Sequence, residues 1–240
     1  MHNSNAILCI SLPIGVKSFE ELDSSRNKEL LISTKYWITE SAKTLRRYIS
    51  SCKLGVQIDE LEIVEWNKHG EQTEVYKFLH KNNQLGNIGL VSDAGMPGIA
   101  DPGALAIAWA HQNGLKVIPI TGPSSIFLAM AASGLNGQSF KFNGYLPVKT
   151  PELKKKMANM VSDIKRDNTA QLFIETPYRN KNLFEELLNQ IPNSIALCLA
   201  FDIQGEHEFI ETMTLTEWKK KNLKWPKAPC VFILGNFLQR

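Results

Sequence analysis

Short apolar runs alternate along the chain with longer stretches that carry apolar residues on one face. Apolar runs that stop at Gly or Pro are typical of buried parallel strands, and a 3.6-residue period indicates helices. This pattern predicts strands over 6–12, 36–39, 59–67, 88–91, 116–120, 171–174 and 195–201. It predicts helices over 18–32, 40–48, 71–83, 104–112, 126–133, 152–166 and 181–190. Strands and helices that alternate in this way predict an α/β fold.

The segment 88–103 combines an apolar strand, a loop rich in Gly and Pro, and the start of a helix. Its glycines, Gly95 among them, allow positive φ or a close approach of a ligand to the backbone. Asp101 is predicted to cap the helix over 104–112, with Pro102 as its first residue. Because the loop follows the carboxyl end of a strand, we expect a ligand to bind there.

The chemistry of this loop narrows the class of ligand. It contains no Lys or Arg, and it lacks both the G-x-x-x-x-G-K-[ST] and the G-x-G-x-x-G phosphate motifs. The carboxylates of Asp93 and Asp101, with exposed backbone groups, suit a neutral or cationic ligand with hydroxyls and amines. The alternative is an ordinary strand-to-helix connection in which the two aspartates only cap and turn.

Composition adds few constraints. The chain has 240 residues, enough for one large domain or two small ones. Its 27 Lys and Arg and 24 Asp and Glu give a net charge of +3 (27 − 24), which permits nucleic acid binding but does not favour it. The scattered cysteines favour reduced thiols over disulfides or a metal site; they are Cys9, Cys52, Cys198 and Cys230. No run has transmembrane length and no signal-peptide pattern is present, so we expect a cytoplasmic protein without membrane contact.

The loop S-D-A-G-M-P-G-I-A-D-P-G at 92–103 resembles the signature loop of the tetrapyrrole-methylase superfamily of S-adenosyl-L-methionine (SAM) dependent methyltransferases. It is most similar to the branch that methylates a cytidine ribose 2′-hydroxyl in small-subunit ribosomal RNA, whose loop reads S-D-A-G-T-P-G-I-S-D-P-G. Only Met96 and Ala100 differ. The segments P-I-G at 13–15, T-G-P-S-S at 121–125 and F-K-F-N-G-Y-L-P at 140–147 extend the resemblance.

The resemblance implies two α/β domains with SAM in the cleft between them, and a homodimer. The segment 147–151 has linker composition, so we expect domains over 1–146 and 147–240. A closing strand over 227–235 is expected to cover the adenine side of SAM.

The resemblance also implies roles for particular residues. The expected cofactor contacts are Pro13, Asp93, Ala94, Gly95, Ile99, Ser124, Ser125, Glu175, Ala200 and Cys230. The expected RNA contacts are Arg46, Arg47 and Arg179. A ribose hydroxyl needs a general base or an activating hydrogen bond. The candidates are Glu40, Asp93, Asp101 and Glu175, and the sequence does not choose among them.

Some segments depart from the pattern of the RNA-methylating branch. Its A-R-E-L-T-K-x-H-E becomes A-F-D-I-Q-G-E-H-E at 200–208, without the Arg and the Lys. This departure concerns the substrate rather than the cofactor. The segment 16–19 also departs, and His69 in the loop after the third strand is a further candidate base. Lysines along 152–166 suit RNA, or simply a solvated helix face.

The sequence therefore predicts a SAM-dependent methyltransferase with a ribose of small-subunit ribosomal RNA as first-choice acceptor. One alternative is a methyltransferase of the same superfamily that acts on a small molecule or another RNA. A second is a non-catalytic relative that binds SAM or RNA. An NAD-dependent oxidoreductase is the third, and the missing G-x-G-x-x-G motif argues against it.

Overall fold

The structure, a computed structural model, describes residues 5–15, 25–66 and 72–237. The chain divides into two compact units, Met1–Ser124 and Ser125–Arg240, called the first and second unit below. The sequence placed the boundary 22 residues later, between 146 and 147. The departure at 16–19 and the candidate base His69 lie outside the described residues.

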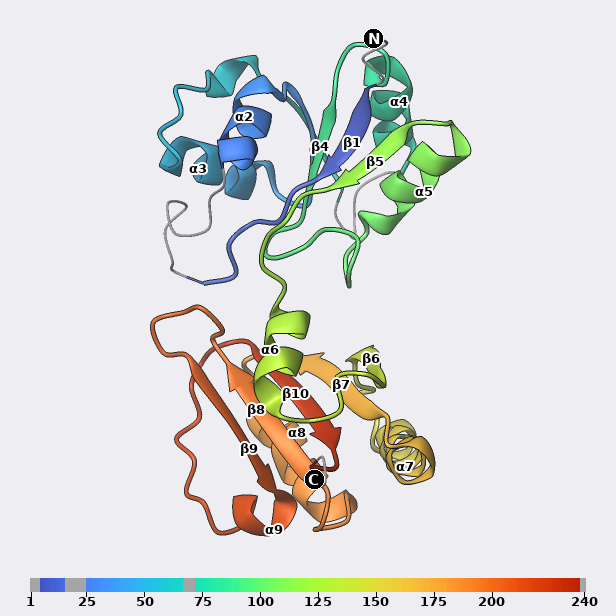
Figure 1. Ribbon diagram of the computed structural model, residues 1–240, viewed down its shortest axis with the longest axis vertical. Coiled ribbons are helices and arrows are strands. Elements are labelled where there is room, and N and C mark those ends of the chain that lie inside the picture. The colour runs from blue at the N-terminus through green and yellow to red at the C-terminus, as the bar shows by residue number, and fades with distance from the viewer. Residues whose placement is uncertain (1–4, 16–24, 67–71, 238–240) are drawn as a thin grey trace. The chain divides into compact units, whose positions relative to one another are not determined.

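The first unit contains a five-stranded sheet in which every pair of neighbours is parallel. The strands are β1 Ala6–Cys9, β2 Tyr36–Thr39, β3 Glu62–Glu65, β4 Ile88–Val91 and β5 Lys116–Pro119, in the order β3-β2-β4-β1-β5 (Figure 1). The strands predicted from apolar runs are thus confirmed, with ends that shift by a few residues.

Helices cover both faces of this sheet (Figure 1). They are α2 Ser25–Ser33, α3 Ala42–Ser51, α4 Gln72–Asn82 and α5 Ala104–Gln112, with a short 3-10 turn at Ile58–Glu60. Along β1, Leu8 packs in the core with α2 and α3, whereas Ile7 and Cys9 pack with α4 and α5. This alternation follows from the two-residue period of a strand and explains why β1 is apolar throughout.

The strand order creates a switch point between β1 and β4. The chain leaves β1 toward β2 on one side of the sheet, and it leaves β4 toward β5 on the other. In open parallel sheets, the carboxyl ends of such neighbouring strands form the usual ligand site. The segment 92–103 follows β4 and lies at this point.

The second unit contains a mixed sheet with the order β6-β7-β10-β8-β9. Its strands are β6 Phe140–Tyr145, β7 Ala170–Glu175, β8 Ala196–Phe201, β9 Phe209–Thr214 and β10 Cys230–Gly235. Only β6 and β7 are parallel, and the other neighbours are antiparallel. β9 had not been predicted, because all six of its residues are half-buried and its apolar signal is weak.

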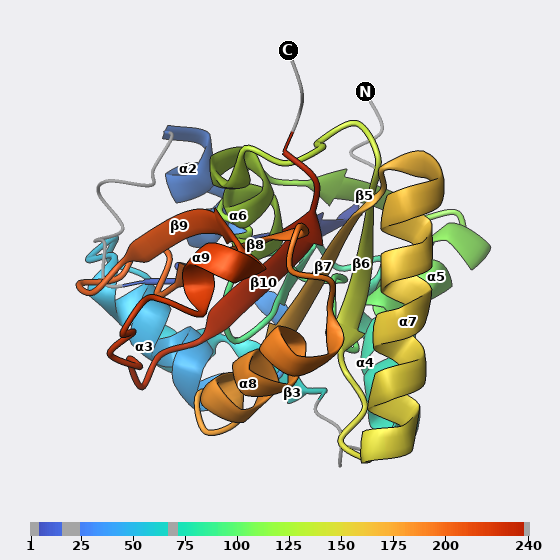
Figure 2. The same cartoon turned by 90° about the horizontal axis from the view of Figure 1, so that it is seen from below.

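Two layers of helices enclose this sheet. α7 Thr150–Asp167, α8 Asn180–Gln190 and α9 Leu215–Trp218 share a core with one face, and α6 Ser125–Ser133 packs on β9 and β10 (Figure 2). Thr212 donates a 2.7 Å hydrogen bond to the carbonyl of Ser133 at the end of α6. Because α6 and β6 pack within the second unit, the division of the chain precedes the predicted linker. No helix among the described residues is long and apolar enough to span a membrane.

Candidate functional site

The loops after β1 and β4 are tied together at the carboxyl edge of the first sheet. Leu12 and Gly95 exchange two backbone hydrogen bonds, of 3.1 and 3.0 Å, in an isolated antiparallel bridge. The buried hydroxyl of Ser92 donates to the carbonyls of Ala94 and Gly95, at 3.1 Å each. The start of the signature loop is therefore held by its own hydroxyl and by the loop that carries Pro13.

Gly95 marks the meeting point of three loops. Its φ of +75° favours glycine, and a Cβ atom there would lie 3.2 Å from Ile14 Cγ2 and 3.6 Å from the carbonyl oxygen of Pro123. Ile14 belongs to the loop after β1 and Pro123 to the loop after β5. A residue without a side chain is thus required where the three loops converge.

Asp101 organises the second half of the loop. Its carboxylate accepts hydrogen bonds from the backbone N–H of Gly98 at 2.9 Å and of Gly103 at 2.6 Å. The prediction that Asp101 caps α5 is wrong: Gly103 is the N-cap residue, and no side chain caps the helix. The Asp-Pro pair had the composition of a cap, but the carboxylate reaches back across the loop instead.

The surroundings of Asp101 perturb two acidic groups. Burial raises the pKa of the Asp101 carboxyl, although the backbone N–H donors of Gly98, Gly103 and Ile99 lower it. Burial, with a smaller contribution from the charge of Asp101, raises the pKa of the Cys9 thiol to about 11. Cys9 is therefore a protonated thiol at neutral pH.

Glu40 and Asp101 line the same small hollow, together with residues at the ends of β2 and β4. The hollow has room for about one water molecule, so it is too small for a nucleoside. Asp93, by contrast, is exposed at the start of the loop, and its carboxylate has no partner among the described side chains and amides. The four candidate carboxylates thus have different surroundings.

The remaining cofactor candidates of the first unit lie on the same loops. Ala94 is exposed, whereas Pro13 and Ile99 are half-buried. Ser124 is buried and ends the first unit, and Ser125 is the first residue of α6 in the second.

Arg46 and Arg47 project from α3, the helix that follows β2. Both side chains are exposed. The Ser41 side chain caps this helix by accepting from the Thr44 N–H at 3.2 Å, and Glu65 accepts from the Ala42 N–H at 2.6 Å. The two arginines are thus presented to solvent by a helix with a well-defined start.

In the second unit, three predicted cofactor residues lie on adjacent strands. Cys230 of β10 pairs with Glu175 of β7 and with Phe201 of β8, and Val231 pairs with Ala200. Glu175, Ala200 and Cys230 are all buried, and burial raises the pKa of the Cys230 thiol well above its usual value.

Glu175 already has two partners. One carboxylate oxygen accepts from the Thr176 N–H at 2.7 Å, and the other lies 3.0 Å from a guanidinium nitrogen of Arg179. The Glu175 side chain is fully buried and that of Arg179 is 34% exposed. The structure therefore brings a predicted base and a predicted RNA contact together as an ion pair.

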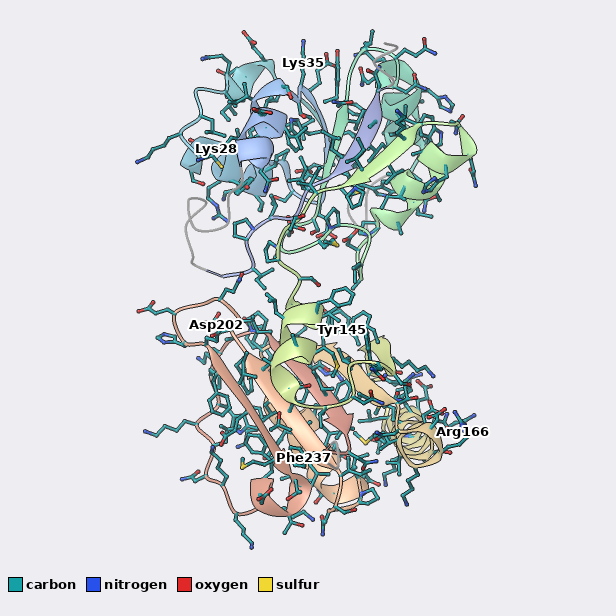
Figure 3. The ribbon with its side chains drawn as sticks, viewed as in Figure 1. Lys28, Lys35, Tyr145, Arg166, Asp202 and Phe237 are labelled. Atoms are coloured by element: carbon teal, nitrogen blue, oxygen red, sulfur yellow. The ribbon has the colours of Figure 1, made fainter. Side chains whose placement is uncertain are left out.

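The segment that lacks the Arg and Lys of the RNA-methylating branch forms a tight turn after β8. Asp202 has a φ of +47° and accepts from the His207 N–H at 3.0 Å, and Glu208 accepts from the Gln204 N–H at 2.6 Å. The side chains of Glu208 and of Asp202, which Figure 3 labels, thus close this turn through hydrogen bonds to its backbone.

Sequence reasoning missed Ser11, which lies two residues beyond the end of β1. Its hydroxyl is buried without a hydrogen-bond partner in the described part of the chain, and it faces Gly122, where any Cβ atom would collide with it. A serine at the end of an apolar strand gave no separate signal. Within the described ranges no group of three or more His, Cys, Asp or Glu side chains is placed to hold a metal ion.

No family model matches the chain. Several curated proteins named ribosomal RNA small subunit methyltransferase I are similar to it. The protein from Vibrio cholerae is 34% identical over 149 residues, which are 62% of this chain and 50% of the relative. The protein from Halalkalibacterium halodurans is 33% identical, over 57% of this chain and 46% of the relative. The protein from Haemophilus influenzae is 30% identical, over 69% of this chain and 58% of the relative. The chain spans about half the length of these relatives.

Solved structures share the fold over nearly the whole chain. Diphthine synthase superposes with a TM-score of 0.65 at 14% identity, covering 96% of this chain and 90% of its own. The methyltransferase CobJ superposes with a TM-score of 0.64 at 15% identity, covering 97% and 95%. Uroporphyrin-III-C-methyltransferase from Thermus thermophilus reaches 0.58 at 14% identity, covering 97% and 95%. The predicted resemblance and the α/β tetrapyrrole-methylase fold are confirmed.

Proposed function

We propose that this protein is a SAM-dependent methyltransferase that methylates a ribose 2′-hydroxyl, expected to be that of a cytidine, in small-subunit ribosomal RNA. The curated relatives are named as methyltransferases of small-subunit ribosomal RNA, and proteins of the same fold include methyltransferases. The observation that carries the proposal is the convergence of three loops on Gly95, at the switch point of a parallel sheet.

The residues around Gly95 suit the binding of a nucleoside with an amino-acid tail. When bound, SAM supplies a methyl group on a positively charged sulfonium. The exposed carboxylate of Asp93 is free to accept hydrogen bonds from hydroxyls or amines, and the exposed backbone of Ala94 adds further polar groups. Displacement at carbon needs alignment and exclusion of water more than it needs a metal or a covalent nucleophile.

The partners of the four carboxylates sort the candidates for the base. The Asp101 carboxylate accepts hydrogen bonds from two backbone amides. The Glu175 carboxylate accepts one from the Thr176 N–H and forms an ion pair with Arg179. We therefore assign both to the architecture of the loops rather than to proton transfer. Asp93, whose carboxylate is exposed, and Glu40, which lines the small hollow beside Asp101, stay the candidates for accepting the ribose proton.

The proposed RNA contacts are cationic side chains. Arg46 and Arg47 are exposed on α3, and guanidinium groups bind phosphate through paired hydrogen bonds. Arg179 keeps 34% of its side chain exposed while it pairs with Glu175. A cytoplasmic location is part of the proposal, since small ribosomal subunits are found there.

A homodimer also belongs to the proposal, because the resemblance implies one. Exposed aromatic residues in the second unit support it: Phe127 and Phe140 pack edge to face with ring centroids 6.2 Å apart, and Tyr145 is 55% exposed (Figure 3). An exposed apolar patch marks an interaction site when its side chains are contiguous, as those of Phe127 and Phe140 are. Sedimentation equilibrium is the direct measurement of this state.

The turn over 202–208 favours a second candidate function. The branch's Arg and Lys are absent there, and the turn is closed by carboxylates that do not attract phosphate. A relative that methylates another acceptor, or that binds SAM without turnover, would show these features. Both candidates keep the same cofactor site.

The deciding experiment is transfer of a labelled methyl group from SAM to small ribosomal subunits purified from a strain that lacks the modification. The proposal predicts label in a single RNA nucleotide, resistant to alkaline cleavage at that ribose. SAM binding without transfer to these subunits would favour the second candidate function instead.

A further inference from the structure

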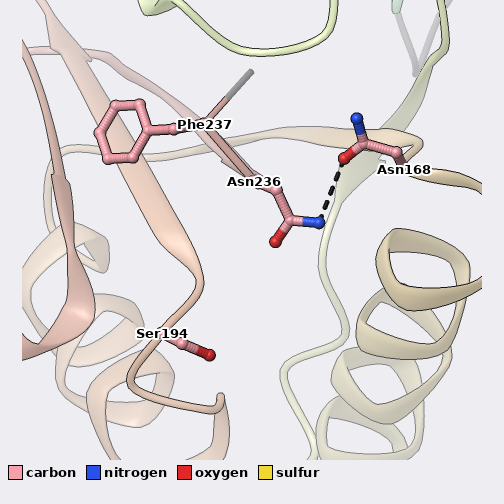
Figure 4. Close-up of a pocket in the computed structure, with 4 residues that line it drawn as sticks. All are labelled: Asn168, Ser194, Asn236 and Phe237. Atoms are coloured by element: carbon pink, nitrogen blue, oxygen red, sulfur yellow. Dashed lines mark hydrogen bonds between the residues drawn. The ribbon is translucent and has the colours of Figure 1, made fainter. Parts of the chain in front are cut away.

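A separate pocket opens at the far end of the second sheet, with a volume of about 640 Å³. Of the residues that the structure describes, four line it: Asn168 after α7, Ser194 before β8, and Asn236 and Phe237 after β10 (Figure 4). Cavities of this size hold small molecules in other proteins.

The pocket is distinct from the proposed cofactor site. Glu175 and Cys230 lie at one end of β7 and β10, whereas Asn168 and Asn236 lie beyond the other end. A strand rises about 3.3 Å per residue, so the six residues of β10 separate the two ends by about 17 Å. In Figure 3, Asp202 and Phe237 mark the opposite ends.

The backbone holds Asn168 in a defined position. This residue adopts a left-handed conformation with φ 53°, and its N–H donates to Ile164 at 3.0 Å. Its carbonyl accepts from the Asn136 amide at 2.9 Å. The side chain of Asn168 is therefore presented from an anchored backbone, as a recognition group requires.

The side chains of the two asparagines that line the pocket are hydrogen-bonded to each other. Asn236 Nδ2 donates to Asn168 Oδ1 at 3.1 Å (Figure 4). This bond leaves Asn168 Nδ2 as a donor and Asn236 Oδ1 as an acceptor. Neither atom, nor the Ser194 hydroxyl, has a hydrogen-bond partner among the residues that the structure describes.

The lining favours a neutral, planar, polar ligand. None of the four described residues that line the pocket is charged, and the pocket lies at the carboxyl end of α7, whose dipole repels phosphate. Phe237 is 46% exposed and offers a ring face. Asparagine amides recognise the adjacent donor and acceptor of a base edge, and aromatic rings stack on unpaired bases.

A nearby lysine favours a nucleic acid strand over a free base as the ligand. Lys219 donates to the side chain of Asn193, the neighbour of Ser194, at 2.8 Å. The ammonium is thus held beside the pocket, where it can meet a phosphate of the same strand.

We propose that this pocket binds an unpaired base of an RNA strand, apart from the site of methyl transfer. The pocket would hold the RNA at a second point while the target ribose reaches the first. The idea extends the proposed function but does not require that methyl transfer occurs.

The test is fluorescence anisotropy of a short labelled oligoadenylate with the full chain. Base stacking and amide recognition predict that Phe237→Ala and Asn236→Ala each weaken binding by about fivefold or more. Phe237→Leu keeps apolar surface without a ring face and is expected to lose nearly as much. Gln190→Ala, an exposed amide at the end of α8, is the matched control and should bind as the wild type does.

Two competitors identify the ligand. Excess adenosine should displace the oligomer, and ribose 5-phosphate should not. Unchanged oligomer binding in Phe237→Ala and Asn236→Ala, or displacement by ribose 5-phosphate instead of adenosine, would overturn the proposal. Adenosine binding as tightly as the oligomer would overturn its RNA part. The same variants should keep the wild-type affinity for S-adenosylhomocysteine. Failure of the base-pocket proposal is thus distinguished from failure of the proposed function, because the latter would show as absent S-adenosylhomocysteine binding in the wild type.

Discussion

Leu12 and Gly95 exchange backbone hydrogen bonds of 3.1 and 3.0 Å, although 83 positions separate them (95 − 12). This bridge joins the loops after β1 and β4 at the one place where the sheet's connections diverge. The proposed cofactor site depends on it, because the bridge fixes where the backbone of the signature loop is presented.

Gly95→Val should abolish binding of S-adenosylhomocysteine in calorimetry. The valine needs φ +75° and meets Ile14 Cγ2, so the three loops must separate. The control is Gly114→Ala, which has a similar φ of +68° with no atom within 4 Å of the new Cβ. If both variants bind S-adenosylhomocysteine equally well, the convergence of the three loops at Gly95 is not required for cofactor binding.

Asp93→Ala should lose ligand affinity while its free energy of unfolding stays within about 0.5 kcal/mol of the wild type. The reason is that the side chain is exposed and makes no described hydrogen bond or ion pair. Calorimetry and urea unfolding together check this. Wild-type affinity would remove Asp93 from the cofactor site.

Asp101→Ala should lower the free energy of unfolding by about 2 kcal/mol, since it leaves two loop amides without their charged acceptor. Asp101→Asn keeps one acceptor oxygen and should lose less. Urea unfolding of both variants measures this. Equal losses would mean that side-chain volume, not hydrogen bonding, matters at this position.

The pKa of Asp101 sets the sign of a pH dependence. Burial raises the pKa of Asp101 in the folded state, so protonation of this carboxyl stabilises the fold. This stabilisation is fully present below the unfolded-state pKa of about 3.9, and it is lost as pH rises through the folded-state pKa. The stability of the wild type relative to Asp101→Asn should therefore fall with rising pH above about 4. A difference that grew with pH would show that the amide hydrogen bonds outweigh burial.

Arg179→Ala should destabilise the second unit by about 2 kcal/mol or more, because it strands the buried carboxylate of Glu175. Adding Glu175→Gln should recover part of that loss. Arg166→Ala removes an arginine that pairs with Asp163 and Asp167 on an exposed helix face, and it should not change the melting temperature measurably. No recovery in the double variant would contradict the ion-pair account.

The four cysteines should react slowly with a thiol reagent in the native protein at pH 8. All are buried, and the pKa values of Cys9 and Cys198 are raised to about 11 by burial. In denaturant, four thiols per chain should react rapidly. Rapid reaction of a native thiol would show that one of these strands opens readily.

Local patterns were enough to predict most of the elements. The helix predicted at 104–112 is α5, and the strands predicted at 36–39 and 88–91 are β2 and β4, because each is apolar enough for its burial to determine its conformation. β9 was missed because an edge strand that is half-buried throughout carries little pattern.

Long-range partners could not be predicted in the same way. The Asp-Pro pair at 101–102 reads as a helix cap in any local window, and only the folded loop brings the carboxylate to Gly98. The unit boundary depends on α6 packing against β9 and β10, which lie more than 70 residues later in the chain. Likewise, only the folded chain shows that the Glu175 carboxylate is already paired with Arg179.

The most direct test of the account is calorimetric titration of the wild-type protein with S-adenosylhomocysteine, beside SAM and NAD. The account predicts saturable binding of both sulfur compounds at one site per chain, with no binding of NAD. Absence of binding by either sulfur compound, or tighter binding of NAD, would contradict the assignment of the loops around Gly95 to SAM.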